Sequence, residues 1–369
     1  MSARTMEGME RALQPPVGHL EQVRGLWSAD ADDRLVHALL FDGPEGVGKF
    51  LSALHLAAGL YCDLGPGPPC GRCGPCRRFA SGGEESNHPD LLIVDPADWG
   101  WEVIKLEAIA PRDDGDIPPR RSVEGFLDLS SVEGGHRVVI LRDAHRMNVA
   151  SQNALLKTLE EPRAGTVLIL VTSRPEELLD TIMSRVMRVH FERLDRGSAA
   201  ELIHELGPEG LTETMAADLA RWSTGSPGRA LRLLRQGRPA ERQLLADLIT
   251  GKRGPIETSH RVWELEGEFG GGTERAKARG RGRAMVDLCL ELIADTERVL
   301  AGTAPEDLAH GDLVQAMLRA APGGHLSALA LDRATEVLGR CRADLVGNLT
   351  PEAVLDRTML ALGGLLAPS

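Results

Sequence analysis

A glycine-rich stretch with one lysine, residues 41–50, is the first place in this chain where residue types and spacing predict chemistry. It follows an apolar run at 35–40, which predicts a buried strand, and it precedes residues 51–58, which predict a helix. Such a turn directs backbone N–H groups and a helix N-terminus at one point, where phosphate binds. Seven of the eight positions of a phosphate-binding loop are in order, and Gly43, Gly46, Gly48 and Lys49 are the residues that would bind the phosphate.

Two positions that normally hold Mg²⁺ beside such a loop carry side chains that cannot bind it. Phe50 stands where a Ser or Thr hydroxyl is expected. Arg142 follows the predicted strand 137–141, where an acidic residue is expected, and Asp143 takes the next position. Because a guanidinium repels Mg²⁺ and a phenyl ring offers no ligand, we expect neither a Mg²⁺ site nor ATP hydrolysis. ATP binding without turnover stays open, since backbone amides need no metal.

Four cysteines within fifteen residues form the second chemical signal. Two Cys-x2-Cys steps share one cysteine, and a Gly/Pro-rich segment leads back to the fourth, giving Cys62, Cys70, Cys73 and Cys76. Four thiolates complete the tetrahedral coordination of Zn²⁺ and leave no position for water, so we expect a structural zinc site in an insertion at 62–79. The spacing alone leaves open an iron–sulfur cluster or four free thiols.

Length and charge limit the classes of protein to be considered. With 369 residues, two or three domains are expected. The net charge of −12 argues against a protein that coats duplex DNA, although a local basic patch stays open. Residues 1–13 contain no apolar segment typical of a signal peptide, and no apolar run approaches the roughly 18 residues of a membrane span. We therefore expect a cytoplasmic protein.

Apolar runs and helical patterns alternate through the first half of the chain, which predicts an α/β domain with a parallel sheet of five strands. Helices without strands follow. We expect a nucleotide-type α/β domain at 1–194, a small helical lid at 195–250 and an all-α domain at 251–369. The predicted strands after the first are 91–94, 137–141, 166–171 and 188–191.

The motifs taken together resemble the clamp-loader subunits of bacterial DNA polymerase III, which belong to the AAA+ family. The motifs are the phosphate loop at 43–49, the four-cysteine insertion, residues 153–162, Ser184-Arg185 and residues 225–231. The resemblance covers about residues 17–232, and the remainder matches only in being helical and of fitting length. The family's Ser-Arg-Cys reads Ser184-Arg185-Val186 here, and the arginine's chemistry does not need the cysteine.

The resemblance implies a role within a five-subunit ring that places a sliding β clamp on primed DNA. It implies a stator subunit that caps the ATPases without hydrolysing ATP itself, with gamma/tau and delta subunits as partners, and a C-terminal collar domain that holds the ring together. Arg185 would be an arginine finger acting on a neighbouring subunit's ATP. Arg229 matches the family's second sensor of a nucleotide site, here vestigial, and Thr172 its first.

The sequence also allows other functions and other roles for single residues. Phe50 and Arg142 argue against an ATP-hydrolysing subunit of gamma/tau type. ATP turnover by the isolated chain would favour that alternative. Tight DNA binding by the chain alone would favour a zinc-dependent nucleic-acid-binding protein. Arg229 is either a sensor or only a first-turn residue of its helix. The glycines at 270–272, 280 and 282 predict a break between helices. The basic segment 275–283 within this stretch is expected to be a solvated loop, with contact to DNA phosphates or an acidic partner as the alternative.

Overall fold

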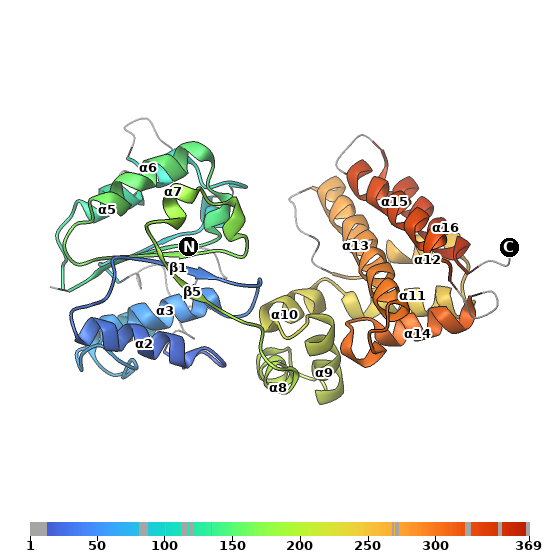
Figure 1. Ribbon diagram of the computed structural model, residues 1–369, viewed down its shortest axis with the longest axis horizontal. Helices are drawn as coiled ribbons and strands as arrows, with labels where there is room; N and C mark the ends of the chain where they lie inside the picture. The colour runs from blue at the N-terminus through green and yellow to red at the C-terminus, as the bar shows by residue number, and fades with distance from the viewer. Residues whose placement is uncertain are drawn as a thin grey trace. The chain divides into compact units, whose positions relative to one another are not determined.

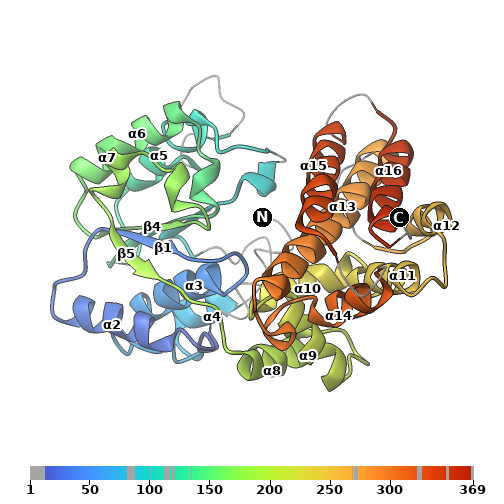
Figure 2. The same ribbon diagram turned by 45° about the vertical axis from the view of Figure 1, so that its right-hand side comes forward.

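The structure is a computed structural model that describes residues 13–80, 88–99, 101–111, 117–118, 121–133, 135–267, 269, 273–321, 326–345 and 349–366. Two compact units are defined by their internal contacts, Met1–Ser198 and Ala199–Ser369. The first contains the sheet and the second is built from helices (Figures 1 and 2). None of the helices in the described residues is long and apolar enough to cross a membrane.

A parallel sheet of five strands forms the centre of the first unit, as the sequence predicts. Its strands lie in the order β2-β3-β4-β1-β5. The bounds are β1 Ala38–Asp42, β2 Leu91–Val94, β3 Arg137–Leu141, β4 Thr166–Val171 and β5 Met187–His190. β1 to β4 consist almost entirely of buried apolar residues, which is typical of a sheet covered on both faces.

Helices cover both faces of this sheet (Figure 1). On one face lie α2 (Leu20–Ala31) and α3 (Lys49–Leu60), which share a buried cluster with Phe41 and Ile140 of the strands. On the other face lie α5 (Val123–Leu127), α6 (Val149–Glu160) and α7 (Asp180–Met183). The unit also contains α4 (Gly74–Ala80) and the 3-10 turns η1 (Pro96–Trp99), η2 (Leu106–Ala108), η4 (Ala144–Arg146) and η5 (Pro175–Glu177).

The strand ends determine which residues meet. In a parallel sheet all carboxyl ends lie at one edge, where ligands bind. The residues that follow β1, β3 and β4 are therefore neighbours although up to 130 positions separate them: the phosphate loop from Gly43, Arg142 and Thr172. The predicted α/β domain with a parallel sheet of five strands is thus confirmed.

The second unit is helical throughout its described residues. Its helices are α8 (Arg196–Leu206, which begins in the first unit), α9 (Glu213–Trp222), α10 (Pro227–Arg235), α11 (Arg238–Ile249), α12 (Pro255–Val262), α13 (Glu274–Leu300), α14 (Gly311–Ala320), α15 (Ala328–Asp344) and α16 (Pro351–Gly364), with the turn η6 (Pro305–Asp307). Leu245 of α11 is buried in one core with Leu292 and Leu355 of the C-terminal helices. The division into a lid at 195–250 and a collar at 251–369 stays a prediction.

The basic segment 275–283 is helical, and the expected loop is wrong. It forms the first turns of α13, where the Thr273 side chain accepts a hydrogen bond from the backbone N–H of Ala276 at 3.2 Å. Its two glycines permit close packing: a Cβ at Gly280 would lie 2.1 Å from the Phe269 carbonyl oxygen, and one at Gly282 would lie 3.1 Å from Leu345. Tertiary contact thus overrides the low helix propensity of glycine. The glycines at 270–272, expected to break the chain here, lie outside the described residues.

Candidate functional site: a phosphate loop without metal ligands

The phosphate loop adopts a backbone that only glycine accepts readily. Gly43, Gly46 and Gly48 have φ values of +134°, +77° and +107°, in the left-handed region. At Gly43 a Cβ would lie 2.1 Å from the carbonyl oxygen of Phe191, just after β5. The three glycines predicted from the sequence are therefore required by the shape of the loop itself.

Lys49 begins α3 and turns its ammonium group back into the loop. Its Nζ donates hydrogen bonds to the carbonyl oxygens of Gly43 at 2.6 Å and Pro44 at 2.5 Å. Burial lowers the pKa of Lys49 to about 8, and the charges of Asp143, Glu45 and Asp42 oppose this decrease. In this arrangement the ammonium group of Lys49 is bound by carbonyl oxygens of the loop itself.

His19 supports the same loop, and nothing in the sequence indicated it. Its ring is buried, with Nε2 3.0 Å from the carbonyl oxygen of Val47 and the ring edge against Phe191. Burial lowers the pKa of His19, so the neutral ring is favoured. The contact joins residues 28 positions apart, and only the folded chain brings them together.

The two positions that lack metal ligands contact each other. The guanidinium carbon of Arg142 lies 4.7 Å from the centre of the Phe50 ring. Its Nη1 lies 3.0 Å from Oδ2 of Asp95, a buried carboxylate just after β2. The arrangement combines a cation–π contact with an ion pair, so the positive charge beside the loop comes from the protein itself.

The residues that follow Arg142 also contribute to this edge of the sheet. Asp143 has a φ of +51°, unusual for a residue other than glycine. His145 places Nδ1 3.1 Å from the hydroxyl oxygen of Thr172, the residue that the resemblance matches to the first sensor. Burial lowers the pKa of His145. The edge of the sheet thus brings together the phosphate loop, Arg142 and Thr172.

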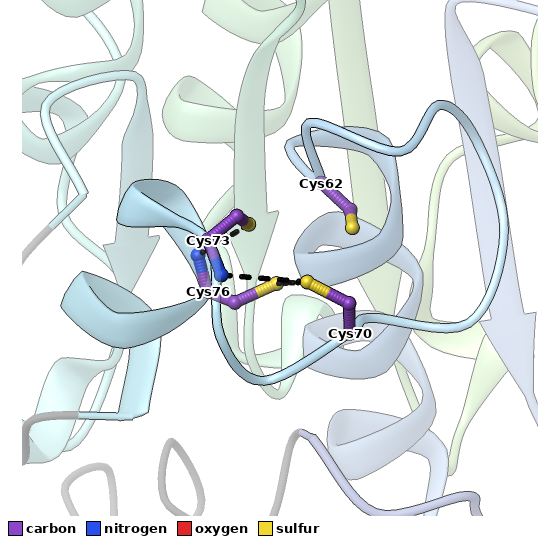
Figure 3. A group of neighbouring side chains, drawn as sticks. All are labelled: Cys62, Cys70, Cys73 and Cys76. Atoms are coloured by element: carbon purple, nitrogen blue, oxygen red, sulfur yellow. Dashed lines mark hydrogen bonds between the residues drawn. The ribbon is translucent and has the colours of Figure 1, made fainter.

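The four cysteines of the insertion converge on one point (Figure 3). Their sulfur atoms all lie within 4.8 Å of one another. Tetrahedral Zn²⁺ with Zn–S bonds of about 2.3 Å would place its sulfurs about 3.8 Å apart, so a small contraction suffices. Backbone N–H groups of Cys73 and Cys76 donate to the sulfurs of Cys70 and Cys73 at 3.4 and 3.5 Å. The four residues fit a metal ion, which would link the end of α3 to α4.

A polar cluster that the sequence did not indicate attaches this insertion to the sheet. The ring of Tyr61 stacks on that of His88 with centres 3.8 Å apart, and the Tyr61 hydroxyl donates to the carbonyl oxygen of Asp90 at 2.6 Å. Glu133 bonds Nε2 of His88 at 2.9 Å and pairs with Arg78 of α4. Because Tyr61 precedes Cys62, order in the insertion is coupled to the sheet.

Arg185 lies away from the phosphate loop, between α7 and β5. The helix expected at 176–183 is shorter, because η5 and α7 divide it. Nη1 of Arg185 donates to the carbonyl oxygen of Thr181 at 2.9 Å, and Nη2 lies 2.7 Å from Oε1 of Glu160. The side chain is 36% exposed, so the guanidinium is held from one side and open on the other.

Arg229 belongs to α10 in the second unit, where its partner is acidic. Its Nη2 lies 2.8 Å from Oε1 of Glu291 on α13, and Oε2 of the same carboxylate lies 3.1 Å from Nε2 of the buried His310. Nη2 of Arg242 on α11 donates to both carboxylate oxygens of Asp312, at 2.8 and 2.7 Å. The pairing shows that Arg229 is an interhelical contact, whereas its nucleotide-binding role stays a prediction.

Glu241 is a buried acidic residue of the second unit. Its side chain is fully buried on α11, and its nearest ion-pair distance is 3.5 Å, to Nε of Arg238. Burial raises the pKa of Glu241 to about 7, against the opposing charges of Arg238 and Arg281. The carboxyl group is therefore close to half protonated at neutral pH.

Comparison with known proteins identifies the class of this α/β domain. Residues 18–195 match the family described as "DNA polymerase III, delta subunit". The chain is 33% identical over 229 residues to the DNA polymerase III subunit delta' of Bacillus subtilis, which covers 62% of this chain and 61% of that protein. It is 35% identical over 202 residues to the Pseudomonas aeruginosa subunit delta', covering 54% and 56%.

Proteins named as tau/gamma subunits also match, and the match covers a smaller share of their length. The DNA polymerase III subunit tau/gamma of Haemophilus influenzae is 30% identical over 251 residues, which is 67% of this chain and 34% of that protein. Among solved structures, a gamma-subunit-related protein of Thermotoga maritima covers 94% of this chain and 100% of that one, with 18% identity. The TM-score of this match is 0.43, which is too low to support a relationship.

The phosphate loop and the five strands of the sheet lie within residues 18–195, the stretch that matches the DNA polymerase III delta subunit family. Within the family the chain resembles the delta-prime subunit. The matched stretch is less than two thirds of the length of either delta-prime relative.

Proposed function

We propose that this chain is a non-hydrolysing stator subunit of a DNA polymerase III clamp loader. In this role it would support the loading of the sliding β clamp onto primed DNA, with gamma/tau and delta subunits as partners in the cytoplasm. The observation that carries the proposal is the contact between Phe50 and Arg142 in a domain related to delta-prime subunits. Both positions that should bind Mg²⁺ take part in one contact that excludes it.

The nature of that contact favours the stator over an ATP-hydrolysing subunit of gamma/tau type. Phosphoryl transfer needs a cation that bridges the β and γ phosphates, held by a hydroxyl and an acidic residue. Restoring one ligand would leave the other replaced, and Asp95 is engaged by the guanidinium of Arg142. The arrangement supports a subunit whose own site does not turn over, whether or not ATP binds there.

A structural zinc ion fits the cysteine cluster better than the alternatives do. The sulfurs surround one point, as a single tetrahedral ion requires. An iron–sulfur cluster distributes its four thiolates over several iron atoms, so their sulfur atoms lie farther apart than those around a single ion. When bound, the ion would supply rigidity to residues 62–79 and no catalysis, since four thiolates leave no open coordination position.

Arg185 is the residue through which this subunit would act on a neighbour. Its guanidinium lies at the start of β5, an edge strand of the sheet. An arginine that reaches the γ-phosphate of an adjacent subunit stabilises the charge of the transition state, worth about 10³–10⁵ in rate where it is fully used. The partly open position of Arg185 supports this use.

The test is Arg185→Ala in a clamp loader reconstituted with its partner subunits, with assembly checked by native mass spectrometry. We expect a partial loss of total ATPase, because only one of several ATP sites would lose its arginine, and a larger loss of clamp loading. Arg193→Ala, which changes an exposed arginine of the same unit, is the matched control. Intact assembly with normal ATPase and loading would contradict the proposal.

A further inference from the structure

We propose that Glu160 is the positioning residue of Arg185: its carboxylate holds the guanidinium in the orientation from which it acts on a neighbouring subunit. The inference rests on the proposed function of Arg185 and adds a residue to it. Glu160 is the last residue of α6, and Pro162 follows two positions later. A negative side chain is thus fixed at a helix end, 25 positions before the arginine that it contacts.

The geometry fixes the plane of the guanidinium from two separate elements. Nη1 is bound from its own segment, by the carbonyl oxygen of Thr181 at 2.9 Å and the hydroxyl oxygen of Ser184 at 3.2 Å. Nη2 is bound from α6, by Oε1 of Glu160 at 2.7 Å. Because the guanidinium is planar and rigid, contacts at two nitrogens determine its direction. Without Glu160 only the contacts from its own segment remain.

The segment that carries Arg185 is itself attached to α6, so Glu160 has a fixed position from which to act. The buried side chain of Gln152 on α6 accepts a hydrogen bond from the backbone N–H of Leu179 at 2.7 Å and donates to the carbonyl oxygen of Glu177 at 3.2 Å. Ile182 of α7 is fully buried in the core beside α6. Gln152 thus sets the place of the segment, while Glu160 sets the direction of the side chain.

The exposure of the pair indicates a role in orientation rather than in stability. Glu160 is 51% exposed and Arg185 is 36% exposed. Ion pairs of this kind add little to the stability of a fold, and a competing anion can separate them. Arg188, three residues later, pairs instead with Asp42, which is 1% exposed. Arg185 is therefore oriented by an exposed carboxylate, whereas Arg188, itself 53% exposed, is bound by a buried one.

The experiment is a double-mutant cycle in the reconstituted clamp loader, measuring ATP turnover at saturating ATP for wild type, Glu160→Ala, Arg185→Ala and the double variant. We expect Glu160→Ala to lower the Arg185-dependent share of turnover by up to about fivefold, the limit for an exposed ion pair. The KM for ATP should not change. Glu160→Gln, which keeps an acceptor oxygen, should lose less. In the Arg185→Ala background the change at Glu160 should have no further effect.

Glu161→Ala is the matched control, since it removes the neighbouring exposed carboxylate, which follows α6. Thermal unfolding and ring assembly should be the same for all variants. The inference is overturned if Glu160→Ala leaves turnover unchanged, raises it, or lowers it equally in both backgrounds. If Arg185→Ala itself has no effect, the proposed function fails and this inference fails with it, and the single variants distinguish these cases.

Discussion

The buried carboxyl group of Glu241 should make the second unit less stable as the pH rises. In the described part of the chain neither of its carboxylate oxygens accepts a hydrogen bond, and burial raises its pKa from 4.5 to about 7. The positive charges of Arg238 and Arg281 oppose this increase, and Glu291 adds to it. Burial is the largest of these effects, so the neutral form is favoured in the folded chain.

The size and sign of the effect follow from linkage. Between pH 4.5 and 7 the folded state holds a proton on Glu241 that the unfolded state has lost, so the free energy of unfolding falls as the pH rises through this window. At about 1.36 kcal/mol per pKa unit, a change from 4.5 to about 7 corresponds to about 3 kcal/mol. The loss should be complete above pH 7 and absent below pH 4.5.

The assay compares the full chain with its Glu241→Gln variant by hydrogen exchange in increasing urea, following amides of α11 and α13 at several pH values from 5 to 8. Other groups titrate in both proteins, so the quantity of interest is the difference in unfolding free energy between them. Between pH 5 and 8 we expect the unfolding free energy of the wild type to fall by about 2.5 kcal/mol relative to that of the variant.

The variant leaves Arg238 without its carboxylate. This loss changes the difference in unfolding free energy by the same amount at every pH, and it does not change how the difference depends on pH. Glu257→Gln, which changes an exposed glutamate on α12, is the control for the loss of a carboxylate outside the core. A difference that stays constant, or that moves in favour of the wild type as the pH rises, would refute the reasoning. It would mean that the charge of Arg238 outweighs burial and that Glu241 is ionised in the folded chain.

Two further predictions concern the metal and the nucleotide. Protein purified without chelator should contain one zinc ion per chain, and its removal should increase hydrogen exchange at residues 62–79 while leaving the sheet protected; near-zero zinc with four titratable thiols would contradict this. The isolated chain should not hydrolyse ATP above background, and Phe50→Thr should not restore turnover because Arg142 remains. Wild-type turnover that disappears in Lys49→Ala would show the opposite.

Signals that are local in the sequence were enough to predict the α/β domain. Short apolar runs separated by helical patterns gave the five strands, because a sheet buried on both faces needs apolar residues at every position. The cysteine cluster was likewise predictable, since Cys70, Cys73 and Cys76 are two steps of one spacing. In both cases the residues that decide the structure lie within a few positions of one another.

Features that depend on tertiary packing could not be predicted. His19 meets Val47 and Glu160 meets Arg185 only after the chain has folded, and neither spacing has a recurring pattern. The error at 275–283 has the same origin: Gly280 suggested a break, but in the fold it permits close contact with Phe269 within one continuous helix. A glycine can therefore end a helix or bring it close to a neighbour, and the local sequence does not distinguish the two.

The contact between Phe50 and Arg142 connects the predicted loss of hydrolysis with the proposed role. Inspection of the sequence gives two independent substitutions, each of which removes one Mg²⁺ ligand. The fold shows that they are one arrangement, in which a guanidinium bound to Asp95 covers the aromatic ring beside the phosphate loop. A metal ion exchanges with solvent and leaves with its nucleotide, whereas this cation is covalently part of the chain. The charge beside the loop is therefore the same with or without a nucleotide, which fits the proposed role of a subunit that does not hydrolyse ATP.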